Sequence, residues 1–261
     1  MTEGITCSPG LPGTRCRRRI YLMRHADVSY FDADGRPLDP RTVPLTAEGR
    51  SQAHAAGRML AEVPFDLAIC SGLTRTVETA CLVLGERDLP LLEERRLREV
   101  RGGRLAEVPT EALERTVAFA YDGAADPDGG FIGGERWTDF DARVSDAWRE
   151  LVARDDWLNL LVVAHDGVNR VLMSQVVGIG LAGLKAFEQD PACVNIIELD
   201  IGHGKIERAY LRAVNIAAYD LVRDGKHLMV MEKIHRNYAA GRTAAEARTM
   251  QDSDVRETVR G

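Results

Sequence analysis

Two stretches of the sequence decide the fold: Ile20-Tyr21-Leu22-Met23-Arg24-His25-Ala26 and Leu161-Val162-Val163-Ala164-His165-Asp166-Gly167. Each is a run of four apolar residues that stops abruptly at charged or titratable side chains. Such runs are typical of strands buried in a sheet. Ligands of open α/β sheets bind at the carboxyl ends of the strands. We therefore expect Arg24, His25 and His165 to meet at a binding site.

Length and composition are those of an ordinary globular protein. With 261 residues, 45% of them hydrophobic and 28% charged, the chain is long enough for one large α/β domain or two small ones. The net charge of −6 argues against nucleic acid or an anionic membrane as the main partner. No apolar run approaches the ~20 residues that span a bilayer. Residues 1–19 lack the apolar core of a signal peptide, so we expect a cytoplasmic protein.

The cysteines predict neither a metal site nor a disulfide framework. They are five in number and widely scattered, and none forms a C-x-x-C pair. We expect reduced thiols, as is usual in the cytoplasm. The residues are Cys7, Cys16, Cys70, Cys81 and Cys193.

Strand-like and helix-like segments alternate along the chain. This alternation predicts a single α/β domain, a three-layer sandwich in which helices flank a mostly parallel central sheet. Thr46 is a suitable N-cap for the first helix. The order of the strands in the sheet does not follow from the pattern. The expected strands are 19–24, 67–70, 89–97, 158–164, 194–199 and 206–214, and the expected helices are 46–61, 75–84, 135–153 and 168–177.

The remaining segments set the domain boundaries. Residues 1–18 are expected to form a flexible N-terminal tail, 19–238 the domain, and 239–261 a polar tail. Within the domain, residues 100–132 contain glycine pairs and prolines, and we interpret them as an insertion that covers the active site. The polar loop 26–44 crosses the same edge of the sheet, and loops of this length are usually functional.

The residues that follow the predicted strands suit a phosphate group. Arg24 and His25 follow the first strand, Arg75 begins a helix after the second, Glu99 follows the third and His165 the fourth. Guanidinium groups bind phosphate oxygens in a bidentate manner, and a helix N-terminus adds N–H donors.

A histidine in such a pocket can act as the nucleophile of phosphoryl transfer. Its free pKa of about 6.5 leaves it mostly neutral at physiological pH, and nearby arginines disfavour its protonated form. A carboxylic acid is then needed to protonate the departing alkoxide, a contribution of roughly 10²–10⁴-fold. Arginines supply the positive charge that Mg²⁺ supplies in other phosphoryl-transfer sites.

Five motifs in these segments resemble those of the histidine phosphatase superfamily, which is phosphoglycerate mutase-like. They follow the family's order over residues 19–177, and together they form a specific signal. They are Arg24-His25-Ala26, Leu45-Thr46-Ala47-Glu48-Gly49-Arg50-Ser51-Gln52-Ala53, Ser71-Gly72-Leu73-Thr74-Arg75-Thr76-Val77-Glu78-Thr79-Ala80, Leu97-Arg98-Glu99 with Gly103, and His165-Asp166-Gly167-Val168-Asn169-Arg170.

The resemblance implies a role for each motif residue. His25 would become phosphorylated, Arg24, Arg75 and His165 would bind the phosphate, and Glu99 would donate the proton. It implies no metal and no cofactor, and a small phosphorylated substrate as the partner.

Departures from the family pattern bear on the substrate and the outcome of the reaction. Asp27 and Phe31 stand where mutases of the family usually carry Glu and Asn, and Ala106-Glu107 stand where the family has Glu-Gly. These differences favour a phosphomonoester hydrolase over a phosphoglycerate mutase, which is the alternative. The third alternative is a catalytically silent phosphate-binding module. Asp27 and Glu107 are the substitutes for Glu99 as the acid.

Other features leave their roles open. Gly133-Gly134-Glu135 is expected to start a helix, and in relatives a similar segment lies near the substrate. A homodimer is the assembly that we consider. The remaining histidines, His54, His203, His227 and His235, are expected to be structural or on the surface.

Overall fold

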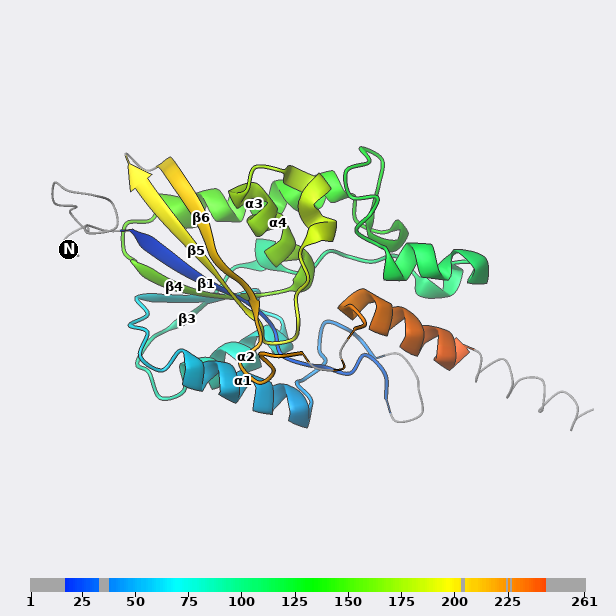
Figure 1. Cartoon of the computed structure of the whole chain (residues 1–261), viewed down its shortest axis with the longest axis horizontal. Coiled ribbons are helices and arrows are strands. Elements are labelled where there is room, and N and C mark those ends of the chain that lie inside the picture. Colours follow the sequence, from blue (N-terminus) through cyan, green and yellow to red (C-terminus); the bar gives the residue numbers. More distant parts are fainter. Residues whose placement is uncertain (1–16, 33–37, 203–204, 224, 226, 243–261) are drawn as a thin grey trace, which may run out of the picture.

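A six-stranded sheet forms the centre of the protein in a computed structural model, which describes residues 17–32, 38–202, 205–223, 225 and 227–242 (Figure 1). The strands lie in the order β3-β2-β4-β1-β5-β6. Their bounds are β1 Arg18–Arg24, β2 Leu67–Cys70, β3 Leu91–Glu93, β4 Asn159–Ala164, β5 Val194–Gly202 and β6 Lys205–Ile216.

The pairing confirms the predicted mostly parallel sheet. Strands β3, β2, β4 and β1 pair in parallel, whereas β5 pairs antiparallel with β1, and β6 with β5. In the register of β1 and β4, Arg24 lies opposite Ala164. The residues that follow them, His25 and His165, therefore leave neighbouring strands at the same edge.

Helices cover both faces of the sheet, which confirms the three-layer sandwich. Helices α1 (Ala47–Met59) and α2 (Thr74–Leu84) cover one face, and α3 (Trp137–Ala153) and α4 (Asp166–Val176) cover the other (Figure 1). Side chains along β1 alternate between the two layers because successive strand residues point to opposite faces. Tyr21 and Met23 pack toward α1 and α2, whereas Ile20 and Leu22 pack toward α3 and α4.

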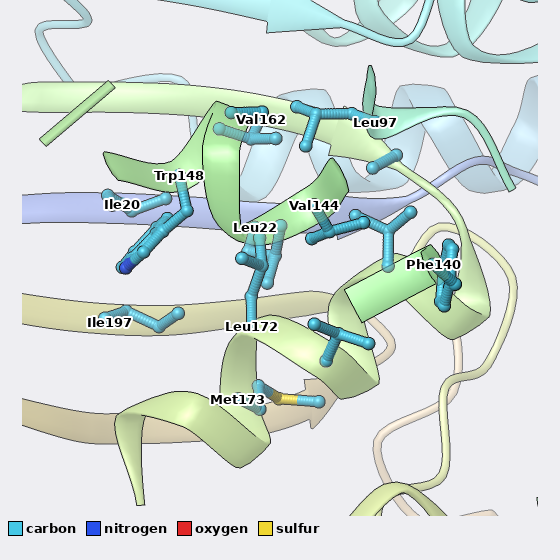
Figure 2. Packing of buried hydrophobic residues seen from close by; sticks show 14 of the residues in the cluster. Ile20, Leu22, Leu97, Phe140, Val144, Trp148, Val162, Leu172, Met173 and Ile197 are labelled. Atoms are coloured by element: carbon cyan, nitrogen blue, oxygen red, sulfur yellow. The ribbon is translucent and has the colours of Figure 1, made fainter. Parts of the chain in front are cut away.

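The layer under α3 and α4 is the larger apolar core. Figure 2 shows Ile20, Leu22, Val162 and Ile197 of the sheet against side chains of the two helices. The helical residues in that view are Phe140, Val144, Trp148, Leu172 and Met173. Ile20 and Leu22 are fully buried, and burial of an aliphatic side chain contributes about 1.5–3 kcal/mol.

Helix α1 begins as predicted. The Thr46 hydroxyl accepts a hydrogen bond from Gly49 N at 2.9 Å and caps the helix. Thr46 is also fixed to the segment after β1, because its backbone N–H donates to Asp27 O at 3.1 Å. The cap therefore ties α1 to the edge where His25 lies.

The strand predicted over 89–97 is present but shorter than expected. Only Leu91–Glu93 pairs with β2, and a 3₁₀ turn at Arg95–Leu97 follows. The Glu94 carboxylate accepts a hydrogen bond from Arg96 N at 2.9 Å, which caps the turn and ends the strand. Glu99 thus lies in an irregular segment that follows this turn rather than at a strand end. The last two strands are each longer than expected.

Residues 100–132 contain no long helix. Short turns at 105–107, 110–112 and 114–118 follow one another, and the segment ends in a turn at 131–133. Its buried side chains join the core of α3 and α4: Leu113, Val117, Tyr121 and Ala124. The Tyr121 ring lies 5.4 Å from that of Trp137, so the segment is packed into the domain.

A helix over residues 230–242 closes the described part of the chain and crosses the expected boundary at 238. Arg242 donates to Val108 O at 3.0 Å and to Thr110 Oγ1 at 2.9 Å. The helix therefore contacts the 100–132 segment, and Figure 1 shows the two beside each other. The expected tails lie mostly outside the described residues, although Arg18 already belongs to β1.

Of the cysteines, Cys70, Cys81 and Cys193 are free thiols, whereas Cys7, Cys16 and the turn residue His203 lie outside the described residues. Within the described ranges no helix has the length and apolar character needed to cross a membrane.

Candidate active site

His25 follows β1 with its ring held in one orientation. Its side chain is buried, and its Nδ1 lies 2.8 Å from Ala26 O. A carbonyl oxygen can only accept, so Nδ1 carries the proton and Nε2 keeps its lone pair. The ring centroid lies 5.2 Å from that of His165. His25 therefore presents a free imidazole nitrogen at the sheet edge.

Residues of two motifs hold the backbone that follows His25. Ala26 N donates to Thr79 Oγ1 at 3.0 Å, and Asp27 N donates to Gln52 Oε1 at 3.0 Å. Any side chain at Gly49 would overlap Asp27 O, so glycine is required for the close approach of α1. Residues of these two motifs thus position the backbone that follows His25.

A chain of hydrogen bonds fixes the tautomer of His165. Its Nε2 lies 2.7 Å from Ser71 Oγ, and Ser71 Oγ lies 3.0 Å from Thr76 Oγ1. The Thr76 hydroxyl donates to Leu73 O at 2.8 Å. Each hydroxyl has one proton, so Ser71 donates to Thr76 and accepts from His165 Nε2. The other nitrogen, Nδ1, accepts from Arg75 at 3.3 Å.

Arg24 and Arg75 are both buried, with 7% and 3% of their surface exposed. One terminal nitrogen of Arg24 donates to Gln189 O at 2.6 Å, and one of Arg75 donates to Pro40 O. The Nε of each has no hydrogen-bond partner among the described residues. Leaving a charged donor buried and unpaired is costly, so both arginines suit an anionic ligand.

The environment keeps both imidazoles neutral. Burial lowers the pKa of His25 well below its ordinary value of 6.5, and Arg75 and Arg24 lower it further. Burial, Arg75 and His25 act in the same direction on the pKa of His165. A neutral His25 is the form that can attack phosphorus.

Glu99 lies at the N-terminus of α4, beside His165. Its half-buried carboxylate accepts from Gly167 N at 3.2 Å and from Val100 N at 2.9 Å. Burial raises the pKa of Glu99, and the nearby Asp166 carboxylate raises it further. A Cβ at Gly167 would lie 2.7 Å from Glu99 Oε1, so glycine makes room for the carboxylate. The arrangement favours a carboxylic acid that can give up a proton.

The two substitutes for Glu99 have other partners. Asp27 Oδ2 accepts from the Thr46 hydroxyl at 2.8 Å, at the cap of α1. Glu107 forms an exposed ion pair with Arg104 at 3.2 Å. Within the described part of the chain, no three His, Cys, Asp or Glu side chains lie together as ligands for a metal ion.

Arg170, the last residue of the fifth motif, anchors the surrounding segments. Its Nε donates to Asp166 Oδ1 at 2.6 Å, and another nitrogen donates to Glu188 at 3.0 Å. Tyr121 of the 100–132 segment donates to Asp166 Oδ2 at 3.1 Å, and Val230 N donates to Glu188 at 2.7 Å. The segment and the C-terminal helix are thus both fastened next to the site.

The structure brings together the five side chains that the strand ends suggested, and it adds others. Ser71, Gln52 and Thr79 lay inside the quoted motifs, and their spacing was the signal for them. No sequence pattern indicated the hydrogen bond between Asp166 and Tyr121, because it joins segments that are distant in the sequence.

Residues 20–211 match the family model of the histidine phosphatase superfamily, branch 1, and the chain belongs to that superfamily. The chain is 29% identical over 204 residues to the adenosylcobalamin/alpha-ribazole phosphatase of Escherichia coli K12, covering 76% of this chain and 98% of that protein. A crystal structure of a putative alpha-ribazole-5′-P phosphatase from Escherichia coli superposes with a TM-score of 0.62 at 29% identity, over 77% of this chain and 97% of that one.

A likeness to mutases is shorter. The 2,3-bisphosphoglycerate-dependent phosphoglycerate mutase 2 of Gloeobacter violaceus is 34% identical over 106 residues, which are 38% of this chain and 48% of that protein. The two alpha-ribazole phosphatase relatives match along nearly their whole length, and they support a phosphatase.

Proposed function

We propose that this protein hydrolyses phosphomonoesters of small metabolites in the cytoplasm through a phosphohistidine on His25. The observation that carries the proposal is the orientation of His25. Its Nδ1–H is held by Ala26 O, so Nε2 keeps its lone pair. Beside it lie two buried arginines whose Nε groups have no hydrogen-bond partner in the described part of the chain. Nucleophile and anion-binding groups are thus in place together.

In the first step, His25 Nε2 attacks phosphorus and the bond from phosphorus to the ester oxygen breaks. Glu99 gives its proton to the departing oxygen, and the alcohol leaves. Arg24 and Arg75 bind the phosphoryl oxygens and neutralise their charge. Neutral His165 completes the pocket and orients Arg75, from which its Nδ1 accepts a hydrogen bond. In the second step, the Glu99 carboxylate takes a proton from water as the water oxygen attacks phosphorus. The bond from nitrogen to phosphorus breaks, and neutral His25 is restored.

A screen of phosphate release over a panel of phosphorylated metabolites tests the activity and identifies the substrate. Alpha-ribazole 5′-phosphate belongs in the panel because a relative that spans the same domain is named for it. Release of phosphate from at least one alkyl phosphate is expected. No release from any member, with an intact fold by circular dichroism, would favour the silent phosphate-binding module.

Glu99→Gln is expected to reduce kcat/KM for alkyl phosphates by roughly 10²–10⁴-fold, and for nitrophenyl phosphate far less. An alkoxide needs a proton to leave, whereas a nitrophenolate leaves without one. The two rates are measured side by side on each variant. Glu107→Gln, which changes an exposed ion pair, is the matched control and should behave as wild type.

The same variants bear on the choice among the three carboxylates. An equal loss on both substrate classes in Glu99→Gln would point to Asp27 or Glu107 as the acid. The pH profile gives a second test. The raised pKa of Glu99 keeps its acid form to higher pH than an ordinary glutamate. Activity on alkyl phosphates should therefore fall as the pH rises through that pKa, and Glu99→Gln should lack this limb.

Activity is expected to survive EDTA unchanged. The buried guanidinium groups of Arg24 and Arg75 can supply the charge that Mg²⁺ supplies elsewhere. The measurement is the phosphate-release rate before and after dialysis against the chelator. Loss of activity that added Mg²⁺ or Zn²⁺ restores would contradict metal independence.

Incubation with 3-phosphoglycerate and a trace of 2,3-bisphosphoglycerate is expected to give free phosphate or no reaction. A mutase must exclude water while the phosphohistidine waits for its acceptor. Here Ser29 is exposed, and Asp27 and Phe31 are only partly buried, so this part of the loop is a poor seal. Rapid interconversion of 2- and 3-phosphoglycerate without phosphate release would establish the mutase instead.

A further inference from the structure

We propose that Arg143, held by Glu135, is a positioning residue for Glu99. The inference rests on the proposed role of Glu99 as the proton donor. It concerns two residues outside the phosphate pocket, on α3 and just before it, which no motif of the site includes.

Arg143 fixes the backbone that carries Glu99. One of its terminal nitrogens donates to Arg96 O at 2.6 Å and to Arg98 O at 2.7 Å, and the other donates to Glu99 O at 3.0 Å. Three carbonyl groups of an irregular segment thus converge on one guanidinium. No regular ladder holds this segment, because β3 ends at Glu93.

Glu135 holds Arg143 and also reaches the far side of Glu99. Its side chain is 2% exposed and accepts a hydrogen bond from Arg143 Nε at 2.8 Å. It accepts a second one, at 3.0 Å, from the terminal nitrogen of Arg143 that also donates to Glu99 O. It also accepts from Arg101 N at 2.9 Å. Although burial raises the pKa of Glu135, its hydrogen bond with Arg143 and those with Arg101 lower it overall, so it stays ionised. Arg143 and Glu135 together therefore hold the backbone on both sides of residue 99.

Close backbone packing completes the support and explains Gly133-Gly134-Glu135. Glu135 N donates to Arg101 O at 2.7 Å, and Gly103 N donates to Ile132 O at 3.1 Å. A Cβ at Gly134 would overlap the backbone of residues 101–103. The glycine lets the two segments touch, which brings the Glu135 carboxylate within hydrogen-bond distance of Arg101 N.

The contacts of Arg143 with residue 99 are to the main chain and not to the carboxylate. The carboxylate itself is held by two backbone N–H groups, from Gly167 and Val100. Its location therefore depends on where the backbone of residues 98–101 lies. A shift of about 1 Å in a reacting group can cost about a hundredfold in rate. A more mobile backbone at residues 98–101 should thus impair proton donation more than phosphate binding or nucleophilic attack.

The test compares Arg143→Lys and Glu135→Gln with Glu99→Gln in the full chain. Each is assayed with an alkyl phosphate and with nitrophenyl phosphate. Both variants are expected to lower kcat/KM for the alkyl phosphate about tenfold to a hundredfold more than for the aryl phosphate. Combining Arg143→Lys with Glu99→Gln should not change the ratio beyond that of Glu99→Gln alone, since both act on one step.

Arg96→Lys is the matched control. Arg96 lies in the 3₁₀ turn just before Glu99, and its side chain pairs with Glu94 and Glu150 at the surface. The ratio of kcat/KM for the alkyl phosphate to that for the aryl phosphate should therefore stay at the wild-type value. Thermal midpoints of all variants are measured, because a merely structural role would lower stability without changing the ratio.

The outcomes separate the two proposals. A selective loss in Glu99→Gln together with an equal loss on both substrates in Arg143→Lys and Glu135→Gln overturns the positioning role alone. An equal loss on both substrates in Glu99→Gln overturns the acid assignment and the positioning role with it. If Arg143→Lys fails to fold, the substrate ratio of Glu135→Gln, which keeps the side-chain volume, decides the question.

Discussion

His25→Ala is expected to lose at least about a thousandfold in kcat, because no other group can accept the phosphoryl group in its place. The methyl side chain also removes the hydrogen bond with Ala26 O, but the backbone of residues 26 and 27 keeps its bonds with Thr79 and Gln52. The fold should therefore survive, as judged by circular dichroism. Phosphate release from the identified substrate is the measurement.

A trapping experiment accompanies this substitution. Wild-type protein quenched during turnover should carry an acid-labile, alkali-stable phosphate on His25, and the alanine variant should carry none. His54→Ala is the control, since His54 lies exposed on α1 and should retain full activity and labelling. A His25→Ala variant that keeps more than about a hundredth of the wild-type rate would rule out the covalent mechanism.

Arg75→Ala is expected to lose about 3–4 kcal/mol of transition-state stabilisation, roughly 10²–10³-fold in kcat/KM, by analogy with the loss of an oxyanion donor. Its buried guanidinium contacts His165, and its Nε has no hydrogen-bond partner among the residues that the structure describes. Its removal therefore takes away both the charge and an oriented donor. Inhibition by inorganic phosphate should weaken in parallel. Both are measured by steady-state kinetics.

Arg87→Ala is the matched control for Arg75→Ala. Arg87 lies just beyond the other end of α2 and donates to the carbonyl oxygens of Val83, Leu84 and Leu60. Its loss should lower the thermal midpoint while leaving inhibition by phosphate unchanged. Unchanged phosphate inhibition in Arg75→Ala would remove Arg75 from the phosphate site.

The sequence predicted the parts of the fold that depend on burial. The apolar runs that became β1 and β4 are buried on both faces, and runs this short, bounded by charged residues, favour strands over helices. Because both strands are parallel and adjacent, their end residues had to meet. The pattern predicted that His25 and His165 share an edge, and the pairing of β1 with β4, which the pattern did not give, makes them neighbours.

The prediction failed where side chains decide the backbone. Strand β3 stops after three residues because the Glu94 carboxylate caps a turn, and hydrophobic periodicity carries no information on such a bond. The contact of Arg143 with Glu99 could not be predicted from the sequence either. It joins residues 44 positions apart, and an arginine inside an amphipathic helix looks like any other polar-face residue.

The register between β1 and β4 makes insertions and deletions more harmful in these two strands than in other parts of the chain. Arg24 lies opposite Ala164, and the backbone N–H of His25 donates to Ala164 O at 3.0 Å. Main-chain hydrogen bonds between the strands therefore hold the two histidines at the same level. Gain or loss of one residue within either strand would turn one imidazole to the opposite face. The 100–132 segment and the C-terminal helix lie outside that ladder. We therefore expect that these two segments can change in length or sequence without disturbing the alignment of His25 with His165.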